Sequence, residues 1–399
     1  MYLGIDDTDS PDGMCTTYLG ALIAEDLKQH GCTIQKMRLI RLNPNVPWKT
    51  RGNAGICIEF DGDAEYALQT AGEFIDKYAQ FSCDNTNPGL VLCKEKPPKE
   101  FYFRALQGFC TVEEAIAELE EIGAKYVGYK NKRGLIGALA AISAVLPDWT
   151  YEYLAYRKPE VFGTERIFDA ESVKQAEMNT TPHTWDSWDF TAEKAVCFPH
   201  GKDPVLYGIR GDSPEWVMKA VSYLKTEEVS LSVLWETNQG TDAHILSFSG
   251  ELLEGRSYSL RGVVSCMPET HEGGHVSFEL GNLLCYAFEP TKIFRRYVRA
   301  LIPGDEIIVY GGYQKGVLHL EKFQLVKAAL LENRESPRCP VCGGRMTSAG
   351  KGKGYKCRSC SGRIREPVFV PRLLSEGWYE VPPDARRHLA KPVIRIVGH

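Results

Sequence analysis

Four aspartates lie close together near the start of the sequence, in the segment GIDDTDSPDGMCTT (residues 4–17). Asp6, Asp7 and Asp9 follow a short apolar run that predicts a strand. Carboxylates this close repel one another when they are ionised, unless a cation lies among them. Mg²⁺ takes such oxygen ligands and shares them with substrate phosphates, which favours phosphoryl or nucleotidyl transfer. A turn is the alternative, because SPDG (residues 10–13) has the composition of one.

The helix expected directly after these aspartates favours the phosphate interpretation. Thr16 and Thr17 lie near its N-terminus, where unpaired backbone N–H groups and the helix dipole attract anions. We therefore expect phosphate chemistry at this loop, with the metal on the carboxylates and the helix N-terminus facing the phosphates.

Two glycine-rich basic segments would complement such a site. WKTRGNAG (residues 48–55) precedes an expected strand, and KNKRGLIG (residues 130–137) precedes an expected helix. Neither is a Walker A sequence or a dinucleotide fingerprint, but cations on a flexible backbone suit phosphate binding. With the aspartates they supply the parts required for phosphoryl transfer. The candidate phosphate or ATP contacts in them are Lys49, Arg51, Asn53, Lys132 and Arg133.

The strongest local motif is a pair of Cys-x-x-Cys sequences, CPVC and CRSC, separated by 14 residues rich in glycine. Two pairs at this spacing are typical of a closed tetrahedral Zn²⁺ site, whereas a redox motif needs only one pair. The site has no open coordination position, so we expect it to stabilise a zinc ribbon and not to catalyse. The predicted ligands are Cys339, Cys342, Cys357 and Cys360.

Charge is distributed unevenly along the chain. Residues 334–399 contain 14 Lys and Arg against 5 Asp and Glu, whereas the first 333 residues contain 33 against 47. A basic region around a zinc site predicts contact with the phosphates of RNA or DNA, and a solvated basic face is the alternative. The basic side chains around the cysteines are Arg338, Arg345, Lys351, Lys353, Lys356, Arg358, Arg363 and Arg365.

The composition of the chain excludes a membrane protein and a small secreted domain. With 43% hydrophobic and 25% charged residues, it lacks both an apolar run of about 18 residues and the features of a secretory signal. At 399 residues, it exceeds what one core organises, so we expect two to four domains. The sequence predicts a soluble, cytoplasmic protein that does not contact a membrane.

The elements that must position the aspartates predict an α/β arrangement. A strand at residues 1–6 and a helix at 16–29 flank the aspartate loop, and the helix has apolar residues along one side. A helix at 135–146 consists of small and apolar residues and must be buried. The other expected elements are strands at 33–42 and 54–60 and helices at 65–81 and 112–123.

The rest of the chain predicts further, smaller modules. Residues 158–203 lack a periodic signal, so we interpret them as a connection between domains. A strand, a helix and a strand within residues 195–245 suit a ferredoxin-like module. From residue 254, five short strands with a helical insert predict an OB-fold β-barrel, with a β-sandwich fragment as the alternative. A barrel followed by a basic zinc ribbon is an arrangement that binds nucleic acids.

Four segments together resemble the archaeal 2-agmatinylcytidine synthetases of the AUA-decoding isoleucine tRNA, over the whole chain. They are GIDDTDSPDGMCTTYLG, RLIRLNPNVPWKTRGNAG, GYKNKRGLIGALAAISA and the terminal CxxC…CxxC ribbon. In that family a kinase-like domain uses ATP and Mg²⁺ to activate the C2 oxygen of the wobble cytidine as a phosphate ester. Agmatine then displaces the phosphate, and the codon read changes from AUG to AUA. The resemblance implies ATP, Mg²⁺ and Zn²⁺ as cofactors and this tRNA and agmatine as partners.

The resemblance also implies roles for single residues. Asp6, Asp7 and Asp9 would bind Mg²⁺ and phosphates, and Thr16 matches the family's autophosphorylated threonine. A carboxylate should pair with the guanidinium of agmatine.

The complete prediction is a multidomain α+β protein. It has a kinase-like α/β catalytic domain (1–160), a linker and ferredoxin-like domain (161–250), an OB-fold (251–333) and a zinc ribbon with a basic C-terminal tail (334–399). Two alternatives stay open: a non-catalytic RNA-binding protein, and an ATP-dependent enzyme that modifies another nucleic acid.

Overall fold

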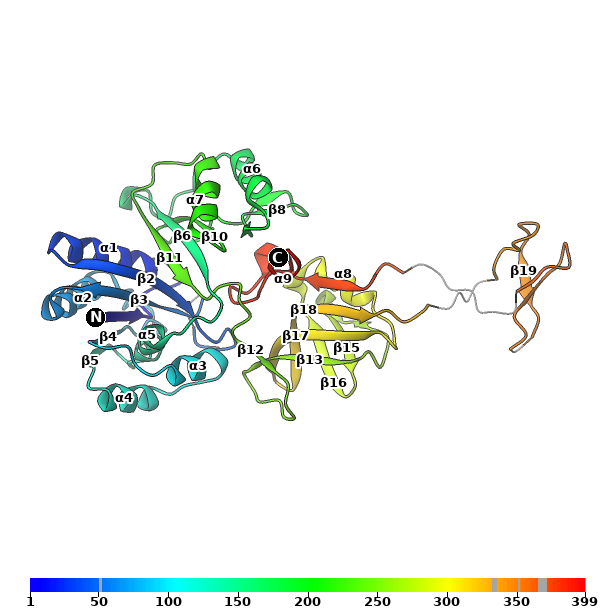
Figure 1. Ribbon diagram of the computed structural model, residues 1–399, viewed down its shortest axis with the longest axis horizontal. Coiled ribbons are helices and arrows are strands. Elements are labelled where there is room, and N and C mark those ends of the chain that lie inside the picture. The colour runs from blue at the N-terminus through cyan, green and yellow to red at the C-terminus, as the bar shows by residue number, and fades with distance from the viewer. Residues whose placement is uncertain (50–51, 332–335, 351, 365–371, 399) are drawn as a thin grey trace. The chain divides into compact units, whose positions relative to one another are not determined.

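The computed structural model describes residues 1–49, 52–331, 336–350, 352–364 and 372–398 (Figure 1). The chain forms two compact units. Unit 1 comprises Met1–Ser259, Tyr310–Gly316 and Glu380–His399, and unit 2 comprises Leu260–Val309 and Val317–Tyr379. Among the described residues, no helix has the length and apolar character needed to cross a bilayer.

Unit 1 begins with a β-α-β-β-α-β module whose strands are all antiparallel to their neighbours. Its strands lie in the order β4-β1-β3-β2, and β5 (Lys125–Gly128) extends the sheet beside β4. The helix predicted at residues 16–29 is confirmed with both of its ends. The module consists of β1 (Tyr2–Asp6), α1 (Thr16–Gln29), β2 (Thr33–Arg41), β3 (Ala54–Asp61), α2 (Ala64–Tyr78) and β4 (Gly89–Cys93).

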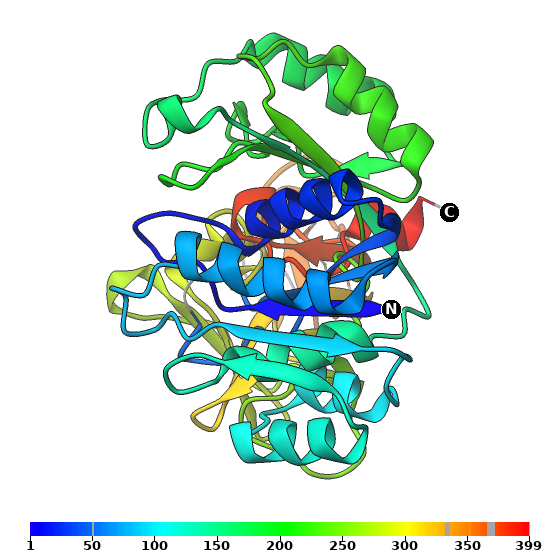
Figure 2. The same cartoon turned by 90° about the vertical axis from the view of Figure 1, so that its left-hand side faces the viewer.

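Both faces of this sheet are covered, so alternate residues of each strand enter two different cores. Helices α1 and α2 lie side by side on one face (Figure 2) and bury Leu3 and Ile5 of β1 there. The other face buries Cys57 and Val91. It is covered by α3 (Glu100–Gln107), α4 (Val112–Glu121) and α5 (Gly134–Ser143).

Helix α5 packs unusually close to the sheet because glycines face it. A Cβ atom added at Gly4 of β1 would lie 2.4 Å from the Ala138 carbonyl oxygen, and one at Gly55 of β3 would lie 2.4 Å from the Gly137 carbonyl oxygen. The prediction that this helix is buried is confirmed. Its close approach brings the N-terminus of α5 next to the end of β1, where the aspartates lie.

A second β-α-β-β-α-β module follows, and its strand order β11-β6-β10-β7 is the ferredoxin-like arrangement. Its edge strand β11 pairs in parallel with β2, so the two modules share one nine-stranded sheet. The module consists of β6 (Thr150–Tyr156), α6 (Ala170–Thr180), β7 (Thr184–Trp185), β10 (Val205–Gly211), α7 (Pro214–Tyr223) and β11 (Leu231–Thr237), with β8 (Trp188–Asp189) and β9 (Lys194–Ala195) between β7 and β10.

The interpretation of residues 158–203 as a connection between domains is wrong. This segment contains α6, which packs against α7, and Val173 and Ala176 of α6 enter a core with Trp188. The buried face of α6 also contains Ser172, Glu177 and Thr180. Because small and polar residues occupy most of that face, the segment has no apolar period of 3.6 residues.

The buried Glu177 of α6 makes the unfolding free energy of the protein depend on pH. Burial, and secondarily the Asp186 carboxylate, raises the pKa of Glu177 from its usual 4.5 to about 7. A raised pKa means that the stabilising contribution of the protonated group is complete below pH 4.5 and is lost as the pH rises through 7. The full shift corresponds to about 3 kcal/mol.

We expect Glu177→Gln to become more stable relative to the wild type as the pH rises. Glutamine keeps an oxygen that can accept the 3.0 Å hydrogen bond from the Ser187 N–H, but it carries no charge. Denaturant unfolding at pH 5 and pH 8 should show the difference in unfolding free energy growing toward about 3 kcal/mol. Glu171→Gln, an exposed position on the same helix, is the control. A pH-independent difference at position 177 would contradict this account.

Unit 2 contains a second sheet, with the strand order β13-β17-β18-β16-β15-β14 and β22 paired with β18. The region from residue 254, where five strands and a helical insert were predicted, contains strands β13 to β18 and the helix α8 (Phe294–Arg299). The strands are β13 (Ser257–Val263), β14 (Glu269–Thr270), β15 (Val276–Leu280), β16 (Leu283–Ala287), β17 (Glu306–Gln314), β18 (Val317–Lys327) and β22 (Gly377–Glu380). Within unit 1, β12 (Ile245–Ser247) pairs with the first residues of β13, and α9 (Val393–Val397) lies near the C-terminus.

Candidate active site

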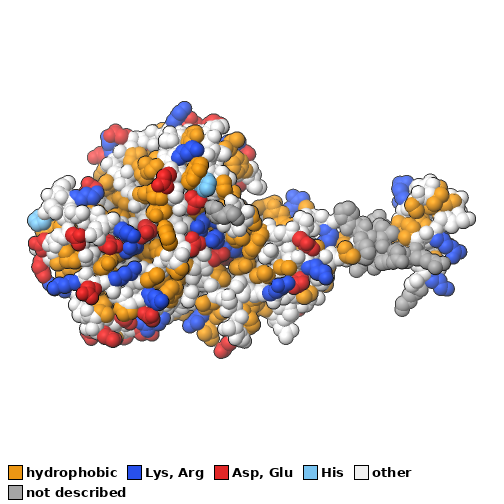
Figure 3. All heavy atoms as spheres, viewed as in Figure 1, with side chains coloured by type: hydrophobic (Ala, Val, Ile, Leu, Met, Phe, Trp, Pro, Cys, Tyr) orange, Lys and Arg blue, Asp and Glu red, His pale blue; other side chains and the backbone are white. Residues whose placement is uncertain are grey.

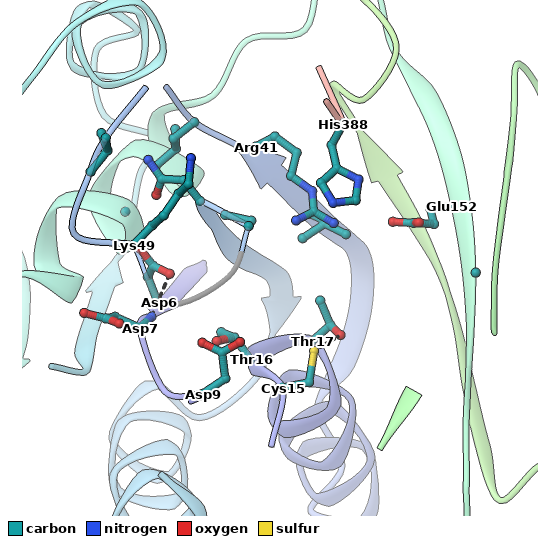
Figure 4. Close-up of a pocket in the computed structure, with 18 of the residues that line it drawn as sticks. Asp6, Asp7, Asp9, Cys15, Thr16, Thr17, Arg41, Lys49, Glu152 and His388 are labelled. Atoms are coloured by element: carbon teal, nitrogen blue, oxygen red, sulfur yellow. Dashed lines mark hydrogen bonds between the residues drawn. The ribbon is translucent and has the colours of Figure 1, made fainter. Parts of the chain in front are cut away.

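Unit 1 contains a cavity of about 380 Å³ beside the aspartate loop. Its wall includes the end of β1, the N-termini of α1 and α5, the end of β2, parts of β6 and β10, and the C-terminal segment. Figure 4 shows the aspartates and Lys49 on one side and Arg41, Glu152 and His388 on the other. The predicted site residues that line the cavity are Asp6, Asp7, Asp9, Thr16, Lys49, Asn53 and Arg133.

Arg51, another predicted site residue, lies outside the described residues. Of the described ones, Lys132 is not among those that line the cavity. Lys132 is exposed, and its backbone N–H bonds to the Tyr129 carbonyl at 2.8 Å. Asn53 does line the cavity, but its side-chain amide donates to the Asn43 carbonyl at 3.0 Å, which indicates that it shapes the wall.

The aspartate loop and the N-terminus of α5 touch directly. The Asp7 backbone N–H donates to Asp6 Oδ1 at 2.6 Å, with Asp7 in the left-handed region at φ 60°. A Cβ atom at Gly137 would lie 1.7 Å from Asp6 Oδ2. Any residue larger than glycine at this place in α5 would therefore displace the Asp6 carboxylate. The first turn of a helix attracts negative charge, so the same place suits both the carboxylates and a phosphate.

Two carboxylates of the loop, Asp6 and Asp7, have raised pKa values. Burial, with repulsion from Asp7 and Asp9, raises the pKa of Asp6 well above its usual value. Burial also raises the pKa of Asp7 to about 6, although the nearby Arg133 opposes the shift. Arg133 Nη2 lies 3.4 Å from Asp7 Oδ2 and donates to the Asn85 carbonyl at 2.8 Å. One guanidinium therefore does not neutralise this cluster, and a further cation would stabilise it.

The donor set fits Mg²⁺ in the form in which this ion binds substrate phosphates. Mg²⁺ takes one or two carboxylates and completes its octahedron with water and phosphate oxygens. Among the described residues, the three aspartates are not a group whose ligand atoms all lie within 4.8 Å of one another. The arrangement therefore fits Mg²⁺ bound by two carboxylates together with phosphate oxygens better than Mg²⁺ bound by all three carboxylates.

Thr16 is the first residue of α1 and is almost fully buried. The Thr8 hydroxyl donates to Thr16 Oγ1 at 3.0 Å. In this bond the Thr16 oxygen accepts, so the proton of the Thr16 hydroxyl is not used in it. Thr16 lines the same cavity as the aspartates.

The opposite wall contains charged residues that the sequence analysis missed. Arg210 Nε lies 3.0 Å from Glu152 Oε1, and Arg210 Nη2 lies 3.0 Å from His388 Nδ1. Arginine can only donate, so His388 Nδ1 accepts and the ring proton is on Nε2. Burial, together with the charges of Arg41 and Arg210, holds the pKa of His388 well below its usual value. The imidazole is therefore neutral, with one N–H as a donor.

No sequence signal could have identified this wall. Arg41, Glu152 and Arg210 lie on strands of two different modules, and His388 follows the zinc ribbon. Only the shared sheet and the return of residues 380–399 to unit 1 bring them together.

The four cysteines in unit 2 form the second candidate site. Cys339 Sγ lies 3.5 Å from Cys360 Sγ, Cys342 Sγ lies 3.5 Å from Cys357 Sγ, and all four sulfurs are within 4.8 Å of one another. Four thiolates at such distances fit tetrahedral Zn²⁺. They lie on a small sheet of β19 (Met346–Ser348), β20 (Tyr355–Cys357) and β21 (Arg363–Ile364), and on its turns.

Exposed cations surround the cysteine site, and blue side chains are visible on this part of unit 2 in Figure 3. Lys351 and Arg365 lie outside the described residues. The exposed cations among the described residues are Arg338, Arg345, Lys353, Lys356, Arg358 and Arg363.

Comparisons with known proteins match most of the chain. Three family models match the chain: the TiaS TCKD domain over residues 2–131, the TiaS FLD domain over 132–244 and the TiaS C-terminal zinc ribbon domain over 336–372. The isoleucine-tRNA 2-agmatinylcytidine synthetase TiaS of Methanocorpusculum labreanum is 59% identical, over 99% of this chain and 97% of its own.

Solved structures agree with these matches. The crystal structure of TiaS in complex with its isoleucine tRNA and ATP has a TM-score of 0.86 and 42% identity, over 99% of this chain and 97% of that chain. The complex of TiaS with the same tRNA, AMPCPP and agmatine has a TM-score of 0.86 and 40% identity, over 99% and 96%. This chain therefore belongs to the TiaS family of isoleucine-tRNA 2-agmatinylcytidine synthetases.

Proposed function

We propose that this protein is an ATP-dependent ligase that joins agmatine to C2 of the wobble cytidine of the AUA-decoding isoleucine tRNA. The single observation that supports this most is the cavity in unit 1, where partly buried aspartates, Arg133 and the N-terminus of α5 meet. Solved relatives in complex with isoleucine tRNA and ATP, and with this tRNA, AMPCPP and agmatine, support the proposal.

The proposed chemistry has two steps. The cytosine C2 oxygen attacks the γ-phosphorus of ATP, the bond to the β-phosphate oxygen breaks, and ADP leaves. The primary amine of agmatine then attacks C2, loses a proton, and the C2–O bond breaks to release phosphate. Phosphorylation is required because an oxygen leaves far more easily as phosphate than as hydroxide. The product is 2-agmatinylcytidine, which pairs with A in place of G.

The acidic and the basic residues of the cavity have different proposed roles. Asp6 and Asp7 would bind Mg²⁺, which neutralises charge on the phosphates when it is bound. Arg133 and Lys49 bind the phosphate oxygens directly, and the dipole of α5 adds a positive potential at its first turn. Arg51 and Lys132 are further candidate phosphate contacts.

Thr16 is proposed to be autophosphorylated, in a step that is separate from the two above and consumes an ATP molecule of its own. Its hydroxyl oxygen would attack the γ-phosphorus of that ATP, lose its proton to a neighbouring carboxylate and release ADP. The position at the start of α1 supports this role, because the helix N-terminus stabilises a phosphate on the residue.

Unit 2 is proposed to bind the tRNA body. We interpret its strands as an OB-fold barrel, with the zinc ribbon presenting fixed cations to phosphates. The order of domains is catalytic (1–160), ferredoxin-like (161–250), OB-fold (251–333) and zinc ribbon (334–399). Two refinements apply: the ferredoxin-like strands begin with β6 at Thr150, and residues 380–399 belong with the catalytic unit. We also propose a cytoplasmic location, because the proposed reaction modifies tRNA and consumes ATP.

Transfer of radiolabelled agmatine to the purified AUA-decoding isoleucine tRNA tests the proposed function. We expect acid-insoluble label only when protein, ATP and this tRNA are all present. Binding of the tRNA without any transfer of label would favour a non-catalytic RNA-binding protein. Label in an unrelated RNA would favour an enzyme that modifies another nucleic acid.

His388 should contribute to the reaction as a neutral hydrogen-bond donor. Removal of such a donor to a charged substrate costs roughly 2 kcal/mol, or about thirtyfold in kcat/KM. We therefore expect His388→Ala to show this loss and His388→Gln, whose amide N–H can replace Nε2–H, to recover part of it. Steady-state kinetics between pH 6.5 and 8 should show no titration of this group, because its pKa lies well below its usual value of 6.5.

The control for this pair is His30→Ala at the far end of α1, where the imidazole is exposed and stacked on Tyr66. An unchanged kcat/KM in His388→Ala would show that the imidazole does not take part in the reaction.

A further inference from the structure

Two large aromatic side chains line the cavity and are still open to solvent. Trp48 is 43% exposed and Phe109 is 44% exposed, and their ring centroids lie 5.8 Å apart with an angle of 41° between the planes. We propose that Trp48 and Phe109 form a stacking subsite for a nucleobase at the open edge of this cavity. This inference rests on the proposed function only for the identity of the nucleotides that reach the cavity.

The position of the pair is unusual for aromatic residues. A buried Phe or Trp removes 150–250 Å² from water and stabilises a core strongly, yet here two rings remain over 40% exposed in a wall that also contains carboxylates and cations. Stacking on a base is worth roughly 1–3 kcal/mol per ring in single-stranded nucleic-acid sites. A planar base would thus cover apolar surface that the protein itself leaves uncovered.

The spacing of the rings determines how a base could bind. Bases stack about 3.4 Å apart, so a base inserted between two rings needs a separation of about 7 Å. At 5.8 Å and 41°, Trp48 and Phe109 already contact each other. The base must therefore stack on the free outer face of the pair, most extensively on the larger Trp48 ring.

Phe109 is fixed from behind by a close contact with the backbone. A Cβ atom at Gly255 would lie 2.2 Å from two carbon atoms of the Phe109 ring, and Gly255 has φ +78°. The ring thus lies directly on this glycine, where no other residue would leave room for it. Phe109 is held in place before any ligand arrives.

A buried asparagine connects the two loops that carry the rings. Asn43, which is 1% exposed, donates from Nδ2 to the Gly108 carbonyl at 2.8 Å and to the Gly255 carbonyl at 2.9 Å. Its own backbone begins the loop that leads to Trp48. Such pinning lowers the entropy lost when a ligand binds, which is expected of a binding site and not of a loose surface loop.

The charges nearby suit a nucleotide. Lys49 follows Trp48 in the chain, and Arg41 and Arg133 line the same cavity. A stacking face beside cations is the usual combination for a base and its phosphates. Two nucleobases come to this cavity under the proposed function: the adenine of ATP and an unpaired base of the tRNA anticodon loop, which must leave its stack to react.

The test measures equilibrium binding of AMPCPP and of the unmodified AUA-decoding isoleucine tRNA, each without turnover, in Trp48→Ala and Phe109→Ala. We expect Kd for one of these two ligands to rise about tenfold in Trp48→Ala, the effect of losing one base stack. The ligand that responds identifies the base. Trp48→Phe should recover most of the affinity, because it keeps an aromatic face.

Trp149→Ala and Phe190→Ala are matched controls, since these rings are 47% and 51% exposed and are not part of the cavity wall. Their Kd values should equal those of the wild type. Unchanged affinity for both ligands in Trp48→Ala and Phe109→Ala, or Trp48→Phe no better than Trp48→Ala, would overturn the proposal.

A fluorescence measurement that compares the wild type with the single variant Trp48→Phe tests the same proposal. Base stacking should quench the emission of Trp48, so the quenching produced by the responsive ligand should be smaller in Trp48→Phe than in the wild type. Equal quenching in both proteins would overturn the proposal. These experiments do not require the transfer of agmatine. If the proposed ligase reaction failed, they would still show whether a nucleobase stacks on Trp48.

Discussion

Asp7→Asn should reduce ATP-dependent transfer of agmatine by about a thousandfold while the Kd for the isoleucine tRNA stays within about twofold. Asp7 lies 3.4 Å from Arg133, and burial raises its pKa to about 6. The substitution keeps the shape of the side chain but removes the negative charge that a metal ion requires. Single-turnover kinetics at saturating ATP, with tRNA binding measured in parallel, would separate the two effects.

Asp12→Asn is the matched control for Asp7→Asn. Asp12 belongs to the same loop, but it is exposed and is not among the residues that line the cavity. We expect it to retain wild-type kinetics. Equal losses of transfer and of tRNA binding in Asp7→Asn would mean that Asp7 stabilises the fold and does not serve the reaction.

Cys339→Ser should have the opposite effect: loss of zinc, with tRNA binding weakened by at least tenfold and AMPCPP binding unchanged. Binding of Zn²⁺ to four thiolates contributes roughly 10–16 kcal/mol to small zinc domains, so removal of one ligand unfolds the ribbon. The cations around it then lose their fixed spacing. Fewer phosphate contacts should also make the dependence of Kd on salt less steep.

The nucleotide cavity is unaffected by this change, because its wall lies in unit 1 whereas the cysteines lie in unit 2. Cys266→Ser provides the control in unit 2, since Cys266 is not one of the four clustered cysteines. Zinc content and Kd should both stay at wild-type values in that variant. Normal tRNA affinity in a zinc-free Cys339→Ser protein would show that the ribbon does not contact the tRNA.

The sequence was sufficient where a local signal determines the structure. Helix α1 begins at Thr16 and ends at Gln29 as predicted, because Leu19, Ile23 and Leu27 recur on one side and Gly31 follows its end. The four cysteines were found because zinc requires a fixed number of ligands at short spacing. The buried α5 was found because its residues are small and apolar throughout.

The sequence was insufficient where burial is polar or where contacts are distant. Helix α6 was missed because Glu177 and Thr180 occupy its buried face. The wall with Arg210 and His388 was missed because it depends on two modules that share a sheet and on a segment that returns after the zinc ribbon. Neither composition nor hydrophobic periodicity can indicate a contact between Arg210 and His388, which lie 178 positions apart in the chain.

The aspartate loop is intermediate between these cases. Its composition suggested either a metal site or a turn, and local sequence did not distinguish them. The contact of Asp6 with Gly137 of α5 favours the metal site, because it holds partly buried carboxylates against a helix N-terminus. A solvated turn would leave them exposed and near their usual pKa.

Mass analysis of the nucleosides of the AUA-decoding isoleucine tRNA, after incubation with the protein, ATP and agmatine, tests the central claim most directly. We predict that the wobble cytidine is replaced by a nucleoside heavier by one agmatine less one water, and that omission of ATP or agmatine prevents this change. An unmodified wobble cytidine after complete incubation with folded, zinc-loaded protein would contradict the account.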